Sequence, residues 1–119
     1  MLFRSEQVDW FNANGGLSWT TARTAESSSI LYRWAEKNDY TTPFVADPAK
    51  RSNVVVTIDF DAAIDAAVIA AALRKNGIVD VEPYRKLGRN QLRISVFPAV
   101  DPSDVTRLTK SIEIGRAHV

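Results

Sequence analysis

Apolar residues recur along the chain with two spacings, one typical of helices and one typical of strands. In the first third, Ser27, Ile30, Leu31 and Trp34 lie three or four positions apart. They share one face of a helix predicted over about 17–38, and we expect that face to be buried. A tryptophan can also stack on a cofactor, but an indole at this spacing is more often part of a core, so we place Trp34 there.

Turn-forming residues divide the N-terminal half of the chain. The Asn-Gly-Gly sequence at 14–16 ends a short helix predicted over 6–13. Ser18 is the expected N-cap of the long helix that follows. The stretch 40–52 is expected to be partly extended, with a turn at its Asp-Pro sequence.

Strands and two further helices are predicted in the second half. The apolar run at 53–60 is rich in β-branched residues and predicts a strand that is buried on both faces. A helix over 65–75 starts at Asp65 as its N-cap, and a short strand is expected over 78–81. The last helix begins at Asp101, which is followed by a proline and an acidic first turn. Its apolar stripe consists of Val105, Leu108 and Ile112.

The predicted elements follow one another as two helices, a strand, a helix, two strands and a helix. This order predicts a two-layer α/β sandwich, with a small mixed or antiparallel sheet and helices on one side of it. At 119 residues, the chain has room for one domain.

Composition excludes several classes of function. A net charge of +1 gives no overall field that would attract nucleic acid or an acidic membrane. The chain has no cysteine, and its one histidine is His118, so we expect no thiolate chemistry, no histidine metal site and no Ser-His-Asp triad. No long apolar run or signal peptide is evident, so we expect a cytoplasmic protein that is not bound to a membrane.

The strongest chemical signal is a basic loop that leads into an alternating strand. Arg85, Lys86, Arg89 and Arg93 fall within nine positions. Arg93 belongs to a strand predicted over 91–97. The inward positions of this strand are Leu92, Ile94 and Val96.

This alternation turns Arg93 away from the core and fixes its guanidinium on a rigid strand. The planar fork of arginine matches carboxylate and phosphate groups, so the loop and strand are suited to a small anion with two charged ends. The more frequent interpretation of such a cluster, taken alone, is a solvated basic hairpin.

Both ends of the chain resemble sequencing-adapter DNA translated in frame. Residues 2–5 correspond to CTCTTCCGATCT, and residues 113–119 correspond to GAGATCGGAAGAGCACACGTC. Our hypothesis is that 1–5 and 113–119 are not native. The stretch 6–112 would then form one domain that is truncated at its N-terminus.

A resemblance to a known family rests mainly on the second half of the chain. The stretches 76–80, 82–94 and 97–100 resemble the C-terminal small domain of phosphoserine aminotransferase in its actinobacterial form. Supporting stretches are 14–17, 31–32, 43–45 and 51–54.

The resemblance implies a fold-type-I transferase that depends on pyridoxal 5′-phosphate and works as a homodimer in serine biosynthesis. Such an aminotransferase moves an amino group from glutamate to 3-phosphohydroxypyruvate, giving phosphoserine and 2-oxoglutarate. Some members also act on a phosphorylated hydroxythreonine in vitamin B6 biosynthesis. The large domain that carries the Schiff-base lysine is outside the resemblance, so the fragment alone is expected to be inactive. We therefore nominate none of the lysines as catalytic: Lys37, Lys50, Lys75, Lys86 and Lys110.

The resemblance also implies roles for the basic residues. Arg93 matches the arginine that binds the substrate α-carboxylate. Tyr84 and Arg85 stand where much of the family has a His-Arg pair that contacts the phosphate or the distal carboxylate. The histidine is absent here, and the loop before Arg93 is longer than in the family. The phosphate contacts are therefore assigned first to Arg85, and Lys86 and Arg89 are the alternative candidates.

Two other functions stay open at this level. The same loop suits a free-standing module that binds or senses a small anion such as phosphoserine. Binding of nucleic acid is the weaker alternative, because the charge is local and is not interleaved with stacking aromatic residues.

Overall fold

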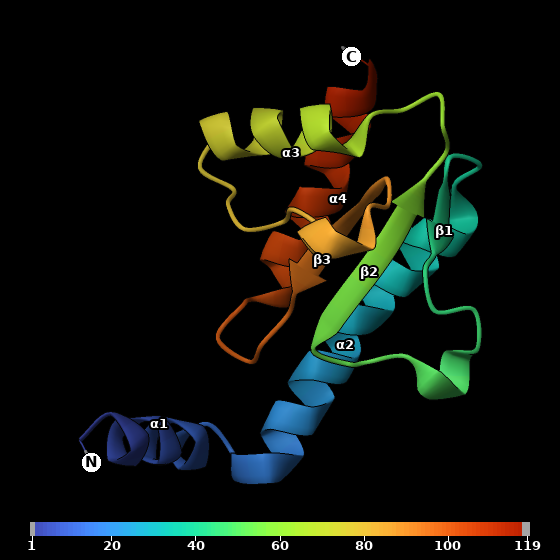
Figure 1. Ribbon diagram of the computed structural model, residues 1–119. Coiled ribbons are helices and arrows are strands. Elements are labelled where there is room, and N and C mark those ends of the chain that lie inside the picture. The colour runs from blue at the N-terminus through green and yellow to red at the C-terminus, as the bar shows by residue number, and fades with distance from the viewer. Residues whose placement is uncertain (1, 118–119) are drawn as a thin grey trace.

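The computed structural model describes residues 2–117 of the chain, and the side chains of 5–115. Helix α1 projects from one end of the molecule, while the other elements pack together (Figure 1). The helices and strands are α1 (Leu2–Ala13), α2 (Gly16–Lys37), β1 (Thr41–Pro43), β2 (Val55–Phe60), α3 (Ala66–Lys75), β3 (Gln91–Ser95) and α4 (Pro102–Ala117). Short 3₁₀ turns lie at Pro48–Lys50 and Arg85–Leu87.

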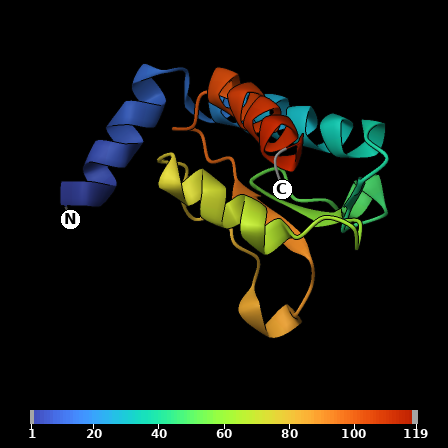
Figure 2. The same ribbon diagram turned by 90° about the horizontal axis from the view of Figure 1, so that it is seen from above.

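The three strands form an antiparallel sheet with β2 in the centre. Helix α2 packs on β1 and β2, α3 packs on β3, and α4 contacts both of these helices. Figure 2 shows α2 and α4 side by side along the sheet. The predicted fold class, a small α/β domain with an antiparallel sheet, is confirmed.

The core lies between the sheet and the helices. Ile58 of β2 and Leu92 of β3 are opposite each other in the register and are fully buried. The helical residues predicted to be buried include Leu31, Trp34, Val105, Leu108 and Ile112, and all of these are buried. Trp34 is therefore a core residue, and its indole N–H donates a hydrogen bond of 2.9 Å to Glu113 Oε1.

The strand predicted over 78–81 is absent, and this changes the order of the elements. Asp80 has φ of 65°, which interrupts an extended backbone. The segment makes one backbone hydrogen bond to the sheet, from the Arg93 N–H to the Val81 carbonyl at 2.9 Å. The third strand is instead β1, which precedes β2 in the chain.

The prediction that the strand at 53–60 is buried on both faces is wrong. Along β2, Val56, Ile58 and Phe60 are buried, whereas Val55, Thr57 and Asp59 are only partly covered. The helices pack on one face only, so the opposite face of the sheet stays accessible. Arg93 of β3 lies on this outer face, and Arg89 pairs there with Asp59 of β2.

Helix starts were predicted with mixed success. Asp65 and Asp101 are N-caps as expected: their side chains accept hydrogen bonds of 2.9 Å from the N–H groups of Ala67 and Ser103. Ser18 is not a cap, because α2 already begins at Gly16. The cap position belongs to Gly15, which has φ of 121° and lies so close to Trp19 that a Cβ atom would clash with it.

None of the described helices combines the length and apolarity needed to cross a membrane. Helix α1 begins within 1–5 and α4 runs into 113–119, so both contain residues that we suspect to be adapter-derived. That hypothesis, and the domain limits 6–112, stay predictions.

Candidate anion-binding site

Strand β3 presents Arg93 on the outer face of the sheet. Arg93 is paired with Thr57 of β2 in the antiparallel register, and its neighbours Leu92 and Ile94 point into the core. Because side chains alternate along a strand, the guanidinium of Arg93 is exposed. The backbone of Arg93 is held on both sides, by β2 and by the Val81 carbonyl. The strand therefore fixes the position of the Arg93 backbone, from which the guanidinium extends.

Arg85 lines the same surface hollow as Arg93, although the two residues are eight positions apart. Arg85 begins the 3₁₀ turn Arg85–Leu87, which closes with a hydrogen bond of 3.1 Å from the Leu87 N–H to the Tyr84 carbonyl. Within the described residues, neither guanidinium has a hydrogen bond or an ion pair from its side chain. Two arginine forks are thus available to an anion in one place.

The other residues of the hollow are Arg74, Asp80, Glu82 and Pro83. Arg74 is already paired: its Nε and Nη2 donate to Glu82 Oε1 at 3.1 and 3.0 Å, and its Nη2 lies 3.5 Å from Asp80 Oδ1. The positive charge not matched by these carboxylates therefore belongs to Arg85 and Arg93.

Hydrogen bonds keep the pair between Arg74 and Glu82 ionised. The backbone N–H of Glu82 itself and the guanidinium of Arg74 lower the pKa of the Glu82 carboxyl. The hydrogen bond to Glu82 and the charge of Glu82 raise the pKa of Arg74. Both side chains are charged near neutral pH, so Arg74 is not a third free cation.

The remaining predicted residues lie outside the hollow. Tyr84 and Lys86 are exposed on the turn and do not line it. Arg89 is paired with Asp59 of β2, with distances of 3.2 Å from Nε to Oδ1 and 2.7 Å from Nη2 to Oδ2. Its guanidinium also stacks over the ring of Phe44, 4.8 Å from the ring centroid.

The hydrogen bond and charge of Asp59 raise the pKa of Arg89, so this cation is permanently charged and already matched. Gln91 donates a further hydrogen bond of 2.8 Å to Asp59 Oδ1. Arg89 thus anchors the end of the basic loop to the outer face of β2.

Sequence reasoning missed the residues that support the loop. The amide N–H groups of Asn90 donate to the carbonyls of Phe60, Asp61 and Ile64 at 3.2, 3.2 and 2.7 Å. Its Oδ1 accepts from the Ala66 N–H at 2.9 Å, at the start of α3. No spacing rule signals such a contact, because the partners are 24 to 30 positions away.

Arg74, Asp80 and Glu82 were also missed as members of the hollow. The signal available in the sequence was an arginine in the last turn of a helix, followed by acidic residues beyond the Asn-Gly stop. The chain turns back after α3, and this brings Asp80 and Glu82 close to Arg74 at the end of the helix.

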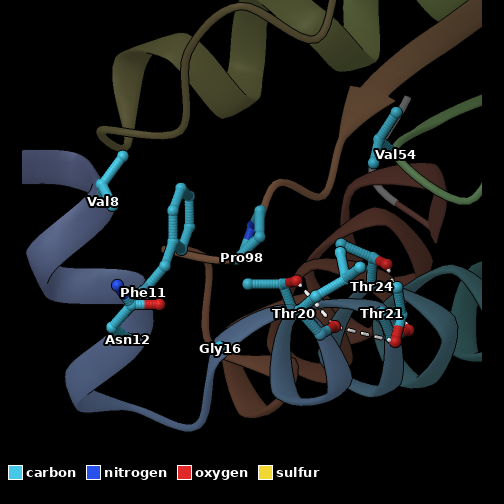
Figure 3. Close-up of a pocket in the computed structure, with 10 residues that line it drawn as sticks. Val8, Phe11, Asn12, Gly16, Thr20, Thr21, Thr24, Val54 and Pro98 are labelled. Carbon is cyan, nitrogen blue, oxygen red and sulfur yellow. Dashed lines mark hydrogen bonds between the residues drawn. The ribbon is translucent and has the colours of Figure 1, made fainter. Parts of the chain in front are cut away.

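A second concave region is apolar and has no charged lining. It lies between α1, the start of α2 and the segment after β3. Figure 3 shows Val8 and Phe11 of α1 on one side, Thr20 of α2 on the other, and Pro98 between them. The adjoining side chain of Phe97 is 52% exposed. We call this region the α1 groove.

Lysines contribute to neither region. All five lysines are exposed, and none lines the hollow or the α1 groove. A lysine that forms a Schiff base is normally activated by desolvation or by a neighbouring cation in a pocket. None of these lysines lies in such a pocket among the described residues, and the expectation that none of them is catalytic stays a prediction.

Comparison with known proteins identifies the family. The chain is 65% identical over 113 residues to the phosphoserine aminotransferases of Rhodococcus opacus and Rhodococcus jostii, and the match covers 95% of this chain. This chain belongs to the phosphoserine aminotransferase family over the part that it spans. It spans 30% of the length of these two relatives. No family model matches the chain.

Solved structures of phosphoserine aminotransferases have the same fold over the matched part. The enzyme from Bacillus circulans subsp. alkalophilus superimposes with a TM-score of 0.82 at 21% sequence identity, covering 92% of this chain and 30% of that one. One from Cytophaga hutchinsonii superimposes with a TM-score of 0.67 at 19% identity, covering 78% of this chain and 25% of that one. At these identities the likeness concerns the fold alone.

Proposed function

We propose that this chain is the substrate-anchoring C-terminal domain of a phosphoserine aminotransferase. The complete enzyme would transfer the amino group of glutamate to 3-phosphohydroxypyruvate and release phosphoserine and 2-oxoglutarate. The proposal rests on one observation above the others. In a chain 65% identical to enzymes of this name, Arg85 and Arg93 share a hollow and have no partner among the described side chains.

Arg93 binds the α-carboxylate in this proposal. Every amino-acid or keto-acid substrate of the reaction has this group, so its anchor must stay in one place, and a central position on β3 provides that. Two parallel N–H···O bonds between a guanidinium and a carboxylate fix the orientation of the substrate as well as its location. Holding the reacting carbon in one orientation lowers the barrier to proton removal.

Arg85 binds the distal anion, which is the phosphate of phosphoserine or the side-chain carboxylate of glutamate. It sits on a short turn rather than a strand, and this suits a group whose length and charge differ between substrates. Lys86 and Tyr84 follow and precede it on the same exposed turn and can reach a phosphate that extends beyond the hollow. Arg89 is the weakest candidate, because its charge is matched by Asp59.

Pyridoxal 5′-phosphate is the cofactor of the proposed enzyme, and it supplies the electron sink for amino-group transfer when bound. The exposed lysines of this chain do not fit a covalent link to it. Among the solved structures of similar fold is a phosphoserine aminotransferase studied for radiation damage of its Schiff base, with a TM-score of 0.81. The cofactor lysine is therefore assigned to the part of the enzyme that this chain does not span, and the isolated chain is expected to be inactive.

The working form of the enzyme is proposed to be a homodimer in the cytoplasm. The chain spans only 30% of its relatives, and both the hollow and the α1 groove open to the surface. The rest of the subunit, or its partner, has room to complete the anion-binding site.

The direct test is Arg93→Lys in the complete polypeptide that contains this chain, purified with pyridoxal 5′-phosphate. Lysine keeps the charge but loses the fork. The half-reactions with glutamate, phosphoserine and alanine are each followed by the absorbance of the cofactor. We expect all three to slow by roughly tenfold to a hundredfold, as for the loss of a charge-assisted hydrogen bond. Normal rates with all three donors would refute the assignment.

A further inference from the structure

The segment that carries Arg85 into the hollow has little regular support. It leaves α3 at Gly77 and runs to the turn at Arg85 without forming a strand. Its backbone is tied to the sheet by one hydrogen bond, between the Arg93 N–H and the Val81 carbonyl. Beyond Val81, some other interaction must fix the path of the backbone through Pro83 to Arg85.

An ion-pair network occupies this position. Arg74 lies in the last turn of α3, and two of its N–H groups donate to a single oxygen of Glu82, at 3.1 and 3.0 Å. The same guanidinium approaches Asp80 at 3.5 Å. The three residues connect the end of a packed helix to the residues just before Arg85, and all three line the hollow.

The backbone of Asp80 supports this interpretation. Asp80 is the one residue other than glycine with positive φ among those described, at 65°. Aspartate tolerates this conformation better than most residues, but it still carries strain that the surrounding structure must offset. The strained residue lies beside the hollow, and its carboxylate points to Arg74.

We infer that Arg74, Asp80 and Glu82 are positioning residues that hold Arg85 beside Arg93, so that the two cations are set for the two ends of one substrate. The inference rests on the proposed function and adds to it the residues that decide selectivity for a doubly charged substrate. Arg93 needs no such help, because β3 holds it directly.

Glu82→Gln in the complete enzyme tests the inference, because two effects have opposite signs. If Glu82 acted only through its charge, removing a carboxylate next to two arginines would strengthen anion binding and lower KM. If Glu82 positions Arg85, KM for phosphoserine rises. We expect a rise of about threefold to fivefold, the scale of one exposed ion pair. The rate with alanine, which has no distal anion, should be unchanged.

A double-mutant cycle identifies the partner. Because Arg74 and Glu82 act on each other, Arg74→Gln combined with Glu82→Gln should raise KM for phosphoserine no more than Arg74→Gln alone. Glu36→Gln is the matched control: it removes the carboxylate of another ion pair, 3.2 Å from Arg51 and outside the hollow, and should leave KM unchanged. Exchanging the two residues, Arg74→Glu with Glu82→Arg, should recover part of the loss.

The outcomes separate this inference from the proposed function. An unchanged or lowered KM for phosphoserine in Glu82→Gln, with a raised KM in Arg85→Ala, would overturn the positioning role and leave the function standing. An unchanged KM in both variants would overturn the function of the site itself. Equal losses with phosphoserine and alanine in Glu82→Gln would show general damage and also overturn the positioning role.

Discussion

The anion hollow and the α1 groove are both concave, yet they are built in opposite ways. The hollow is lined by charged side chains that stand on β3, on the end of α3 and on the loop between them. The α1 groove is lined by apolar and hydroxyl side chains, and one of its walls is a helix that packs mainly on α2. The hollow therefore depends on the core of this chain, whereas the groove lies beside that core.

This difference shows which of the two regions is supported by the hydrophobic core of the chain. Leu92 and Ile94, which flank Arg93 and point into the core, are buried under helices that belong to the chain. Leu17 in the lining of the groove and Phe97 beside it are exposed, at 79% and 52%. Substitutions of the buried residues that flank Arg93 should therefore destabilise the chain strongly, and substitutions along the groove only weakly.

The largest expected effect comes from Leu92→Ala, directly next to Arg93. Leu92 is fully buried against the helices, and its truncation should lower the free energy of unfolding by about 2–5 kcal/mol. The matched change beside the groove, Phe97→Ala, should lower it by less than about 1 kcal/mol, because surface substitutions have small effects. Urea denaturation of the 119-residue chain measures both. Similar losses in the two variants would contradict the comparison.

Asn90→Ala should have the next largest effect. The change removes an amide that bonds three carbonyls and one N–H group between β2, α3 and the basic loop. We expect a loss of about 1–3 kcal/mol in the free energy of unfolding. Asn76→Ala is the control, since the side chain of Asn76 makes one hydrogen bond, to the Ala72 carbonyl. The idea that Asn90 anchors the loop fails if Asn76→Ala lowers the free energy of unfolding by as much as Asn90→Ala.

The smallest expected effect is the pH dependence of the ion pair between Glu82 and Arg74. The pKa of Glu82 is lowered in the folded chain. The ion pair with Arg74 therefore contributes fully to the stability of the folded chain at a pH above the ordinary value of 4.5. That contribution is lost as the pH falls through the lowered value. In Arg74→Gln the pKa should move back up, though not fully, because the backbone N–H of Glu82 still lowers it. An NMR titration of the Glu82 carboxyl that gives the same pKa in both proteins would contradict this.

Helices with strong local signals could be predicted from the sequence, because their determinants lie within a few residues. Asp65 and Asp101 identified helix starts, and the spacing of Ser27, Leu31 and Trp34 identified the buried face of α2, on which Ile30 is only partly buried. The strand expected over 78–81 failed because Asp80 adopts positive φ, which no apolar pattern shows.

The site could be predicted only in part, for a similar reason. The alternation along β3 correctly turned Arg93 outward, and the resemblance selected Arg85. The pairing of Arg89 with Asp59 and of Arg74 with Glu82 joins residues that the fold brings together from 30 and 8 positions apart. A list of basic residues therefore could not distinguish the free cations from the matched ones.

The most direct test of the central claim is the substrate dependence of Arg85→Ala in the complete enzyme. Arg85 and Arg93 are proposed to hold the two ends of one substrate, so losing Arg85 should matter only when a distal anion is present. We predict that kcat/KM falls roughly tenfold or more for phosphoserine and is unchanged for alanine, as for the loss of one charge-assisted contact. An equal fall for both donors, or no fall for phosphoserine, would contradict the claim.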